Sequence, residues 1–157
     1  MEDIWNITAL VVSVLSVLLS LYALRQATTK NTSDMYLFFI SQYAKEDMKL
    51  ALRKLKDIKR GVYRLEQWES DMKNNLPKAF EYDEARRLVK YFYDTLAYMK
   101  LEKLIEARFV RLICLKKGAW LYLDTVEAME KFFDSGYDKK PYAVIRDVCE
   151  NLRKEGS

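Results

Sequence analysis

The N-terminal part of the chain is a continuous run of apolar positions. Residues 4–24 read IWNITALVVSVLSVLLSLYAL and contain no Asp, Glu, Lys or Arg. A helix rises about 1.5 Å per residue, so a helix over this run spans about 30 Å, the thickness of the hydrocarbon core of a bilayer. Trp5 and Tyr22 lie near its two ends, where amphipathic rings favour the headgroup region. The pattern predicts a transmembrane helix over 4–24.

Two other interpretations of this run were weighed. A cleaved signal peptide begins with basic residues, whereas Glu2 and Asp3 stand here, and no small-residue cleavage site follows the run. A buried core helix is the second alternative.

Arg25 and Lys30 follow the predicted span, while no basic residue precedes it. Because basic residues are enriched at the cytoplasmic ends of membrane spans, we expect the C-terminal body in the cytoplasm.

Beyond the run, the apolar positions recur with the period of an α-helix. The clearest stripe lies within 83–101, at Ala85, Leu88, Val89, Phe92, Leu96 and Met99. Further helices are expected over 34–43, 46–60, 102–115, 119–134 and 141–154, with a helical piece within 61–73. The short breaks predict antiparallel neighbours in a compact bundle. We therefore expect an all-α fold, with an N-terminal transmembrane helix in an anchor segment, 1–30, and a cytoplasmic domain, 31–157, of about five or six helices.

The few turn-forming residues set the expected helix ends. The chain has only 4 glycines and 2 prolines, which argues against a many-stranded sandwich or barrel. Pro77 is expected to break the chain before the 83–101 helix. Gly118 and Gly136 stand where left-handed C-caps would end the preceding helices. Pro141 suits the first turn of the last helix.

Small residues recur along one face of the predicted span, at spacings close to half a heptad. They are Ala9, Ser13, Ser16, Ser20 and Ala23. Small side chains let two helices approach closely in lipid, where packing and interhelical hydrogen bonds drive association. This face predicts self-association or docking onto another transmembrane helix. The alternative is that each serine bonds back to the carbonyl one turn earlier.

The net charge of the chain is the sum of an acidic N-terminal segment and a basic remainder. The chain of 157 residues has a formal net charge of +4. Glu2 and Asp3 are the only charged residues of 1–24, so the rest of the chain carries +6. A basic body on the cytoplasmic side would face an anionic lipid leaflet.

Basic residues line one face of the helix expected over 46–60. They are Lys45, Lys49, Arg53, Lys56 and Arg60, whose spacing keeps them within about 80° of one another on a helix of 3.6 residues per turn. A solvated helix face is the first interpretation. An anionic membrane surface is the second, and nucleic acid bound through its phosphates is the third and least favoured.

Catalytic and metal chemistry has little support in the sequence. The chain has no histidine, which removes the commonest general base and the commonest metal ligand. Cys114 and Cys149 stand among apolar residues, so we expect two buried, unreactive thiols without a disulfide. No glycine-rich phosphate loop or nucleophile elbow occurs. We expect no enzyme activity, no cofactor and no metal.

Tyrosine is abundant, with 11 residues in the chain. Four of them stand on or beside the 83–101 helix: Tyr82, Tyr91, Tyr93 and Tyr98. Aromatic rings beside lysines can stack on nucleic-acid bases, and they are also enriched at protein interfaces. Packing in the bundle, with the hydroxyl groups near water, is the favoured interpretation.

The region from Arg86 to Phe133 contains RRLVKYFYDTLAYMKLEKLIEARFVRLI and then the tryptophan-bearing GAWLYLDTVEAMEKFF, with Phe92 and Trp120 as aromatic positions and Arg146 in the expected last helix. On these residues the chain resembles a group of uncharacterised prokaryotic single-pass membrane proteins. Those proteins join an N-terminal transmembrane helix to a small cytosolic helical domain of unknown function. The resemblance implies this layout and no activity. Where the group often has Gly and Asp in a turn, this chain has Lys100-Leu101-Glu102.

These patterns together predict a membrane-anchored interaction or scaffold protein, or an accessory subunit of a membrane complex. It would organise partners at the cytoplasmic face of the cell membrane. The expected partners are the lipid bilayer, another transmembrane helix or a second copy, and anionic lipid headgroups. A membrane-tethered nucleic-acid-binding protein that uses the basic face is the alternative. No small-molecule substrate is evident.

Overall fold

The computed structural model describes residues 16, 18–23, 26, 33–134 and 136–155. The chain divides into two compact units, Met1–Leu37 and Phe38–Ser157. The predicted membrane span, 4–24, lies mostly outside the described residues. Among the residues that are described, no helix combines the length and the apolarity that a bilayer crossing requires.

In the first unit, residues 16, 18–23, 26 and 33–37 are helical. Ala9 and Ser13 of the small-residue face lie outside the described part, whereas Ser16, Ser20 and Ala23 lie within it. The Ser20 hydroxyl donates a 2.8 Å hydrogen bond to the Ser16 carbonyl oxygen, one turn earlier. At this one position, the serine therefore bonds to its own helix as the alternative interpretation expects.

The second unit is a bundle of α-helices, without a strand in its described residues. Helical residues 38–44 lead into Glu46–Lys59 (α2), Leu65–Lys73 (α3), Pro77–Leu101 (α4), Ala107–Cys114 (α5), Gly118–Leu121 (α6), Tyr122–Val126 (η1, a π-helical turn), Glu127–Phe133 (α7) and Lys140–Glu155 (α8). The all-α prediction is confirmed. The helical piece expected within 61–73 forms as α3. The number of helices is higher than the five or six expected, mainly because the predicted 119–134 helix consists of α6, η1 and α7.

Helix α2 follows the predicted pattern closely. Met48, Ala51, Leu55 and Ile58 are buried along one side, and the predicted basic residues lie exposed on the other. Glu46 and Asp47 stand in the first turn of α2 and Lys56 and Lys59 in its last, as the helix dipole favours, although Asp57 also lies in the last turn. Val62 lies beyond the end of the helix and is 74% exposed.

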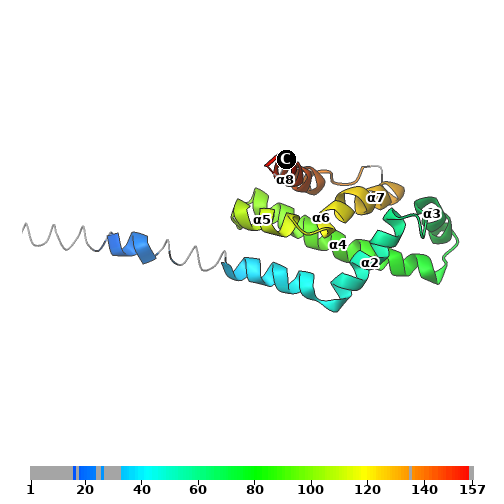
Figure 1. Cartoon of the computed structure of the whole chain (residues 1–157), viewed down its shortest axis with the longest axis horizontal. Helices are drawn as coiled ribbons and strands as arrows, with labels where there is room; N and C mark the ends of the chain where they lie inside the picture. Colours follow the sequence, from blue (N-terminus) through cyan, green and yellow to red (C-terminus); the bar gives the residue numbers. More distant parts are fainter. Residues whose placement is uncertain (1–15, 17, 24–25, 27–32, 135, 156–157) are drawn as a thin grey trace, which may run out of the picture. The chain divides into compact units, whose positions relative to one another are not determined.

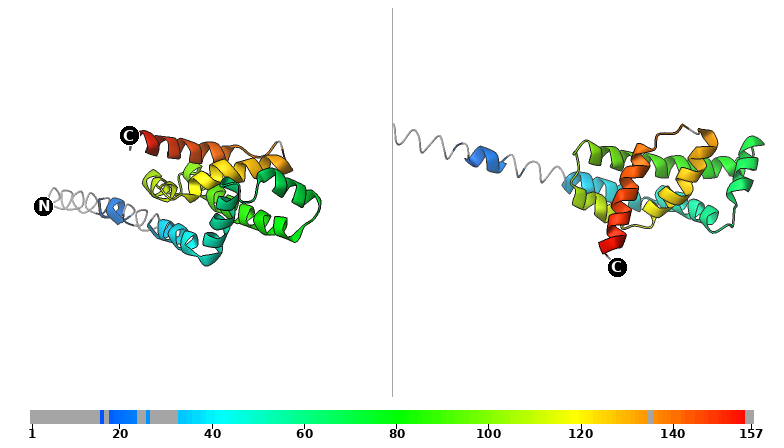
Figure 2. Two further views of the ribbon diagram at one scale, coloured as in Figure 1. Left: turned by 45° about the vertical axis from the view of Figure 1, so that its right-hand side comes forward. Right: turned by 90° about the horizontal axis from the view of Figure 1, so that it is seen from above.

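Helix α4 is the centre of the bundle and packs against α2, α3, α5, η1 and α8 (Figures 1 and 2). It begins at Pro77, six residues before the predicted start. The expectation that Pro77 breaks the chain was therefore wrong in part. Proline is favoured at the start of a helix, because the N–H groups of the first turn have no partner within the helix and the missing N–H of proline is therefore not needed. Most of the predicted stripe is buried, while Leu88 remains 37% exposed.

The turns use other residues than the sequence suggested. Gly118 is the first residue of α6 and not a left-handed cap, and Gly136 has no positive φ either. In the described chain, the glycine with a positive φ is Gly61, at 74°. Lys103 has a φ of 57° and turns the chain between α4 and α5, so α5 is shorter than the predicted 102–115 helix. Pro141 does lie in the first turn of α8, as expected.

Aromatic rings form a continuous stack through the core. The Tyr93 ring stacks on Tyr122 at 5.1 Å, and Tyr122 stacks on Tyr142 at 4.4 Å between ring centroids. Tyr82 and Tyr93 are buried, which confirms core packing for these two tyrosines, whereas Tyr91 is 74% exposed. The stack ties α4, η1 and α8 together.

A buried charge cluster joins α4 to α7. Arg86 donates a 2.7 Å hydrogen bond from Nε to Asp83 and also pairs with Glu130. All three residues are less than 9% exposed. Asp83 is the first residue of the predicted 83–101 helix, but the earlier start at Pro77 places it within α4, where it is buried. Lys90 bridges Glu130 to Asp94, so the carboxylates have cationic partners.

Candidate anion-binding groove

A groove between α2 and the start of α6 gathers most of the basic residues predicted from the sequence. We call it the basic groove, and its volume is about 660 Å³. Its basic lining residues are Lys49, Arg53, Lys56, Lys59, Arg60 and Lys117. Its uncharged lining residues are Tyr43, Leu52, Gly118, Trp120 and Leu121. The volume is within the range of small-molecule and cofactor sites, about 300 to 1,000 Å³.

The predicted basic face is divided by the fold. Four of its five residues, from Lys49 to Arg60, line the basic groove, and all five are exposed. Lys45 precedes α2 and lines a different hollow. The bend at Lys45, between residues 38–44 and α2, separates it from the others. Lys59 and Lys117 join the groove although the sequence did not single them out.

Few of these cations have a counter-ion. Lys49 lies 3.5 Å from Glu46, an exposed pair of little strength, and Lys59 Nζ lies 2.5 Å from the Asp124 carboxylate. Within the described chain, the side chains of Arg53, Lys56, Arg60 and Lys117 form no ion pair. Like charges on one wall repel one another, and the repulsion is relieved when an anion enters. The groove is therefore electrostatically suited to a ligand with several negative charges.

The floor of the groove depends on the absence of a side chain at Gly118. Its N–H donates a 3.2 Å hydrogen bond to the Tyr43 hydroxyl. A Cβ atom at this position would lie 2.9 Å from that hydroxyl and 2.8 Å from the Tyr93 hydroxyl. It would also lie 3.1 Å from Leu52 Cδ2. Glycine thus lets α6 lie close to Tyr43, to Tyr93 of α4 and to Leu52 of α2, and this close packing shapes the floor of the groove.

Two tyrosine hydroxyls lie beneath this floor. Tyr93 is fully buried, and its hydroxyl has no hydrogen-bond partner among the described residues. Burial raises the pKa of Tyr93 well above its usual value, so the hydroxyl stays protonated at neutral pH. Burial also raises the pKa of Tyr43, against the opposite effect of the Gly118 N–H bond. Neither group serves as a base at neutral pH.

Trp120 is the exposed aromatic residue of the groove, with 37% of its surface accessible. Its indole forms no hydrogen bond and no ring contact with another described residue. The other tryptophan of the bundle, Trp68, is completely buried and donates its indole N–H to the Ala79 carbonyl oxygen. Trp120 therefore contributes exposed indole surface to a groove that six cations line.

The side chains that line the groove are cationic, apolar or aromatic. Among its lining residues are no carboxylate, no thiol and no serine or threonine hydroxyl. The nearest carboxylate to its lysines, Asp124, is engaged by Lys59. Cationic side chains, an apolar floor and an open indole can hold and orient an anion, but they offer no nucleophile with an adjacent base.

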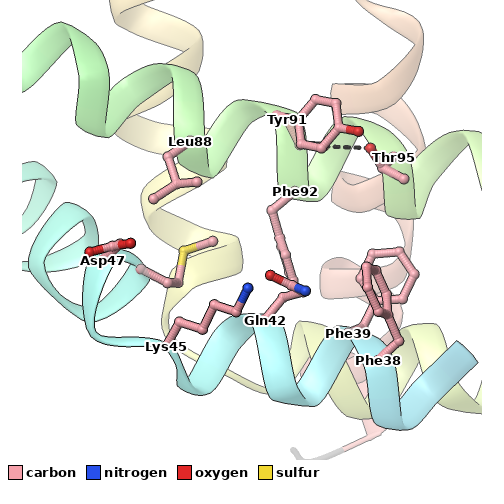
Figure 3. Close-up of a pocket in the computed structure, with 10 residues that line it drawn as sticks. Phe38, Phe39, Gln42, Lys45, Asp47, Leu88, Tyr91, Phe92 and Thr95 are labelled. Atoms are coloured by element: carbon pink, nitrogen blue, oxygen red, sulfur yellow. Dashed lines mark hydrogen bonds between the residues drawn. The ribbon is translucent and has the colours of Figure 1, made fainter.

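A second hollow, of about 280 Å³, lies between α4 and the segment that leads into α2 (Figure 3). Figure 3 shows Leu88 and Phe92 pointing from α4 toward Phe39 and Lys45. Its lining is mostly apolar, and Thr95 bonds back to the Tyr91 carbonyl oxygen at 2.7 Å. The Phe39 and Phe92 rings meet in a T-shaped arrangement, with 5.4 Å between their centroids.

The two cysteines come together between α5 and α8. Cys114 and Cys149 are each 1% exposed, as predicted, and they share a smaller hollow of about 250 Å³ with Trp120. A hydrogen bond to Cys149 and burial raise the pKa of Cys114, so this thiol stays protonated at neutral pH. The described residues contain no cluster of acidic, cysteine or histidine side chains that could hold a metal ion.

Sequence reasoning missed the parts of the groove that lie outside α2. Lys117 and Gly118 were interpreted as a stop signal for the preceding helix, and Trp120 as a family-like aromatic position. Only the contact between α2 and α6 brings them beside Arg53 and Lys56. Lys59 was detectable, since it stands three residues after Lys56 on the same helix, the spacing that places neighbours on one face.

The chain matches no protein-family model, no curated protein and no solved structure. The resemblance to uncharacterised single-pass membrane proteins stays a prediction from the sequence.

Proposed function

We propose that this protein is a single-pass membrane protein whose cytoplasmic helical body binds an anionic partner in the basic groove. It acts as an interaction or scaffold protein, or as an accessory subunit of a membrane complex, and it does not catalyse a reaction. The apolar run over 4–24 supports the membrane anchor, and the basic residues after it support a body on the cytoplasmic side. The anchor keeps the body and its partner at the membrane.

One observation carries the binding part of the proposal: four cations around an apolar floor have no counter-ion within the described chain. Solvated basic faces are common, but they are usually convex or balanced by nearby acids. Here Arg53, Lys56, Arg60 and Lys117 surround a hollow of about 660 Å³. A concave site concentrates the positive potential and raises the local concentration of anions.

Binding of a simple polyanion to the full-length chain tests this function. The protein is placed in nanodiscs of zwitterionic lipid, and sodium polyphosphate is titrated while binding heat is measured. We expect saturable binding that weakens as salt rises, because each contact releases a counter-ion. The Arg53→Glu/Lys56→Glu variant is expected to lose this binding.

A matched control separates the groove from the overall charge. Lys131 and Lys154 are exposed on α7 and α8, away from the groove. The Lys131→Glu/Lys154→Glu variant changes the net charge by the same amount and should bind like the wild type. Equal losses in both variants, or no polyphosphate binding by the wild type, would contradict an anion site in the groove.

A further inference from the structure

We infer that the anionic partner of the basic groove is single-stranded nucleic acid, held by about four phosphates with a base stacked on Trp120. This inference rests on the proposed function and names the chemistry of its partner. It favours nucleic acid, the partner that the sequence alone favoured least. The reason is that the fold adds an exposed indole and a second basic wall to the helix face.

The length of the basic row fits an extended polyanion. Lys49 and Arg60 stand eleven residues apart on α2 and the turn after it, a rise of about 16 Å. A stacked strand carries one phosphate per about 3.4 Å of its length, so this row spans about five phosphates. Because Asp124 engages Lys59, the other four basic residues of the row can contact about four of them. A nucleoside triphosphate concentrates its charge on three directly linked phosphates and leaves part of the row without a partner.

The opposite wall of the groove fits a base. Trp120 is 37% exposed and its ring contacts no other aromatic side chain of the described chain, so one face can receive a planar group. Stacking of bases on aromatic side chains is the main sequence-independent contact in single-strand binding sites. Lys117, three residues before Trp120, places a charge beside that position. A phosphate row on α2 and a stacking platform on α6 together form a single-strand site.

Other anionic partners match fewer of these features. A flat bilayer surface meets convex basic faces readily but reaches the floor of a groove poorly. An acidic peptide supplies negative charge but has no planar group that requires the indole. A duplex keeps its bases stacked inside, so it engages the row of cations and leaves Trp120 without a partner.

The test uses the full-length chain in zwitterionic nanodiscs and a fluorescein-labelled ten-nucleotide uridine RNA. Fluorescence anisotropy reports binding, and tryptophan emission with an unlabelled strand reports contact with Trp120. We expect saturable binding that quenches emission, because the accessible indole lies in the groove and Trp68 is fully buried. The plot of log binding constant against log salt should have a slope of about −3, which corresponds to four phosphate contacts on a single strand.

Two kinds of variants identify the contacts. Lys56→Met removes one phosphate contact and should reduce the magnitude of the salt slope by about 0.7. Trp120→Ala should weaken binding by about 5- to 150-fold, the range for one lost stacking contact. Trp120→Phe keeps an aromatic ring, so most of the affinity should return while the quenching disappears. Trp120→Phe also provides a test of the stacking contact in case Trp120→Ala does not fold.

Several outcomes would overturn the inference. These are equal binding of a ten-base-pair duplex and the single strand, an affinity unchanged in Trp120→Ala, or binding of phosphatidylglycerol vesicles without any binding of RNA. A ten-nucleotide thymidine DNA that binds like the RNA supports it, because the proposed contacts involve phosphates and a base face. If polyphosphate binds but neither strand does, the proposed function stands and this inference fails. If nothing binds, both fail.

Discussion

Gly118 is the residue on which the shape of the groove depends, and its replacement is our first prediction. Gly118→Ala would place a Cβ within 3 Å of the Tyr43 and Tyr93 hydroxyls, which sit at the ends of rigid rings. Overpacking costs about 1 to 3 kcal/mol, and the gain in helix propensity returns up to about 1 kcal/mol. We expect a lower free energy of unfolding, by about 1 kcal/mol or more, in urea denaturation of the detergent-solubilised full chain.

A second substitution checks the cause of that loss. In the Tyr43→Phe background one of the two crowding hydroxyls is absent, so Gly118→Ala should cost less there than in the wild type. Equal stability of Gly118→Ala and the wild type would mean that Gly118 does not lie as close to the two tyrosine hydroxyls as the structure describes. Tyr43→Phe alone removes the acceptor of the Gly118 N–H hydrogen bond, so the free energy of unfolding of this single variant is measured separately.

The buried charge cluster gives a second prediction at the scale of single residues. Arg86→Met preserves much of the side-chain volume but leaves Asp83 and Glu130 buried without their shared guanidinium. Removing one member of a buried ion pair costs about 3 to 5 kcal/mol. Arg108→Met is the control, because Arg108 is exposed and its pair with Glu106 should contribute less than about 1 kcal/mol. Comparable losses in the two variants would contradict the cluster's role.

The sequence predicted individual residues well where one helix determines their surroundings. The buried and exposed sides of α2 could be predicted because both are set by a period of 3.6 residues. The surroundings of Gly118 could not be, since the atoms that exclude a side chain there belong to Tyr43 and Tyr93 on other helices. Asp83 was misassigned for a related reason: its burial depends on α4 beginning at Pro77.

At the scale of elements, an ion pair joins α2 to η1 at the edge of the basic groove. Asp124 lies on η1 and pairs with Lys59 at 2.5 Å. Asp124→Asn frees this lysine, so the RNA salt slope should become steeper by up to about 0.7. Because the pair is exposed, stability should change by less than about 1 kcal/mol. The measurement is the anisotropy titration at several salt concentrations.

Asp147→Asn is the matched control for this third prediction. Asp147 is exposed on α8, pairs loosely with Lys100 at 3.7 Å, and loses the same charge when it becomes asparagine. It should leave the salt slope unchanged. If both variants steepen the slope equally, general charge rather than the freed Lys59 would explain the effect.

Elements were predictable in kind but not at their ends. Proline signals both the end of one helix and the start of the next, so Pro77 marked the boundary without showing where α4 begins. The π-helical turn η1 interrupts a segment whose apolar pattern resembles a single helix, and it positions Tyr122 between the rings of Tyr93 and Tyr142. Local periodicity does not reveal such an interruption, because it is stabilised by contacts with α4 and α8.

At the scale of the whole bundle, the tyrosine stack predicts how stability responds to alkaline pH. Tyr137 packs edge-on against Tyr142 of the stack, with 5.5 Å between the ring centroids. Burial and then a hydrogen bond to Glu127 raise the pKa of Tyr137 to about 12, and burial raises the pKa values of Tyr122 and Tyr142 as well. A pKa raised in the folded state means that the protonated hydroxyl is favoured there. Its stabilising contribution is complete below the unfolded value, near pH 10, and is lost as the pH rises toward 12.

This fourth prediction is checked by following tyrosine ionisation through ultraviolet absorbance near 295 nm. The folded chain should titrate at higher pH than the chain in concentrated urea, and the urea midpoint should fall between pH 10 and 12. Coincident titration curves for the folded and unfolded chains would contradict the burial of the stack. Tyr137→Phe removes one of the shifted groups and should lessen the fall of the midpoint.

The last prediction concerns the whole molecule, whose proposed function requires the anchor as well as the groove. Val14 stands at the middle of the predicted span and Leu24 at its end. Arginine at the centre of a membrane helix costs about 2.5 to 3.5 kcal/mol in insertion, whereas near an end its side chain can reach the headgroups. Val14→Arg should therefore move a large fraction of the protein out of the carbonate-resistant membrane fraction, and Leu24→Arg should not. Since the body is a separate compact unit, Val14→Arg should still bind polyphosphate. Retention of Val14→Arg in the membrane fraction at the wild-type level would contradict a span over 4–24.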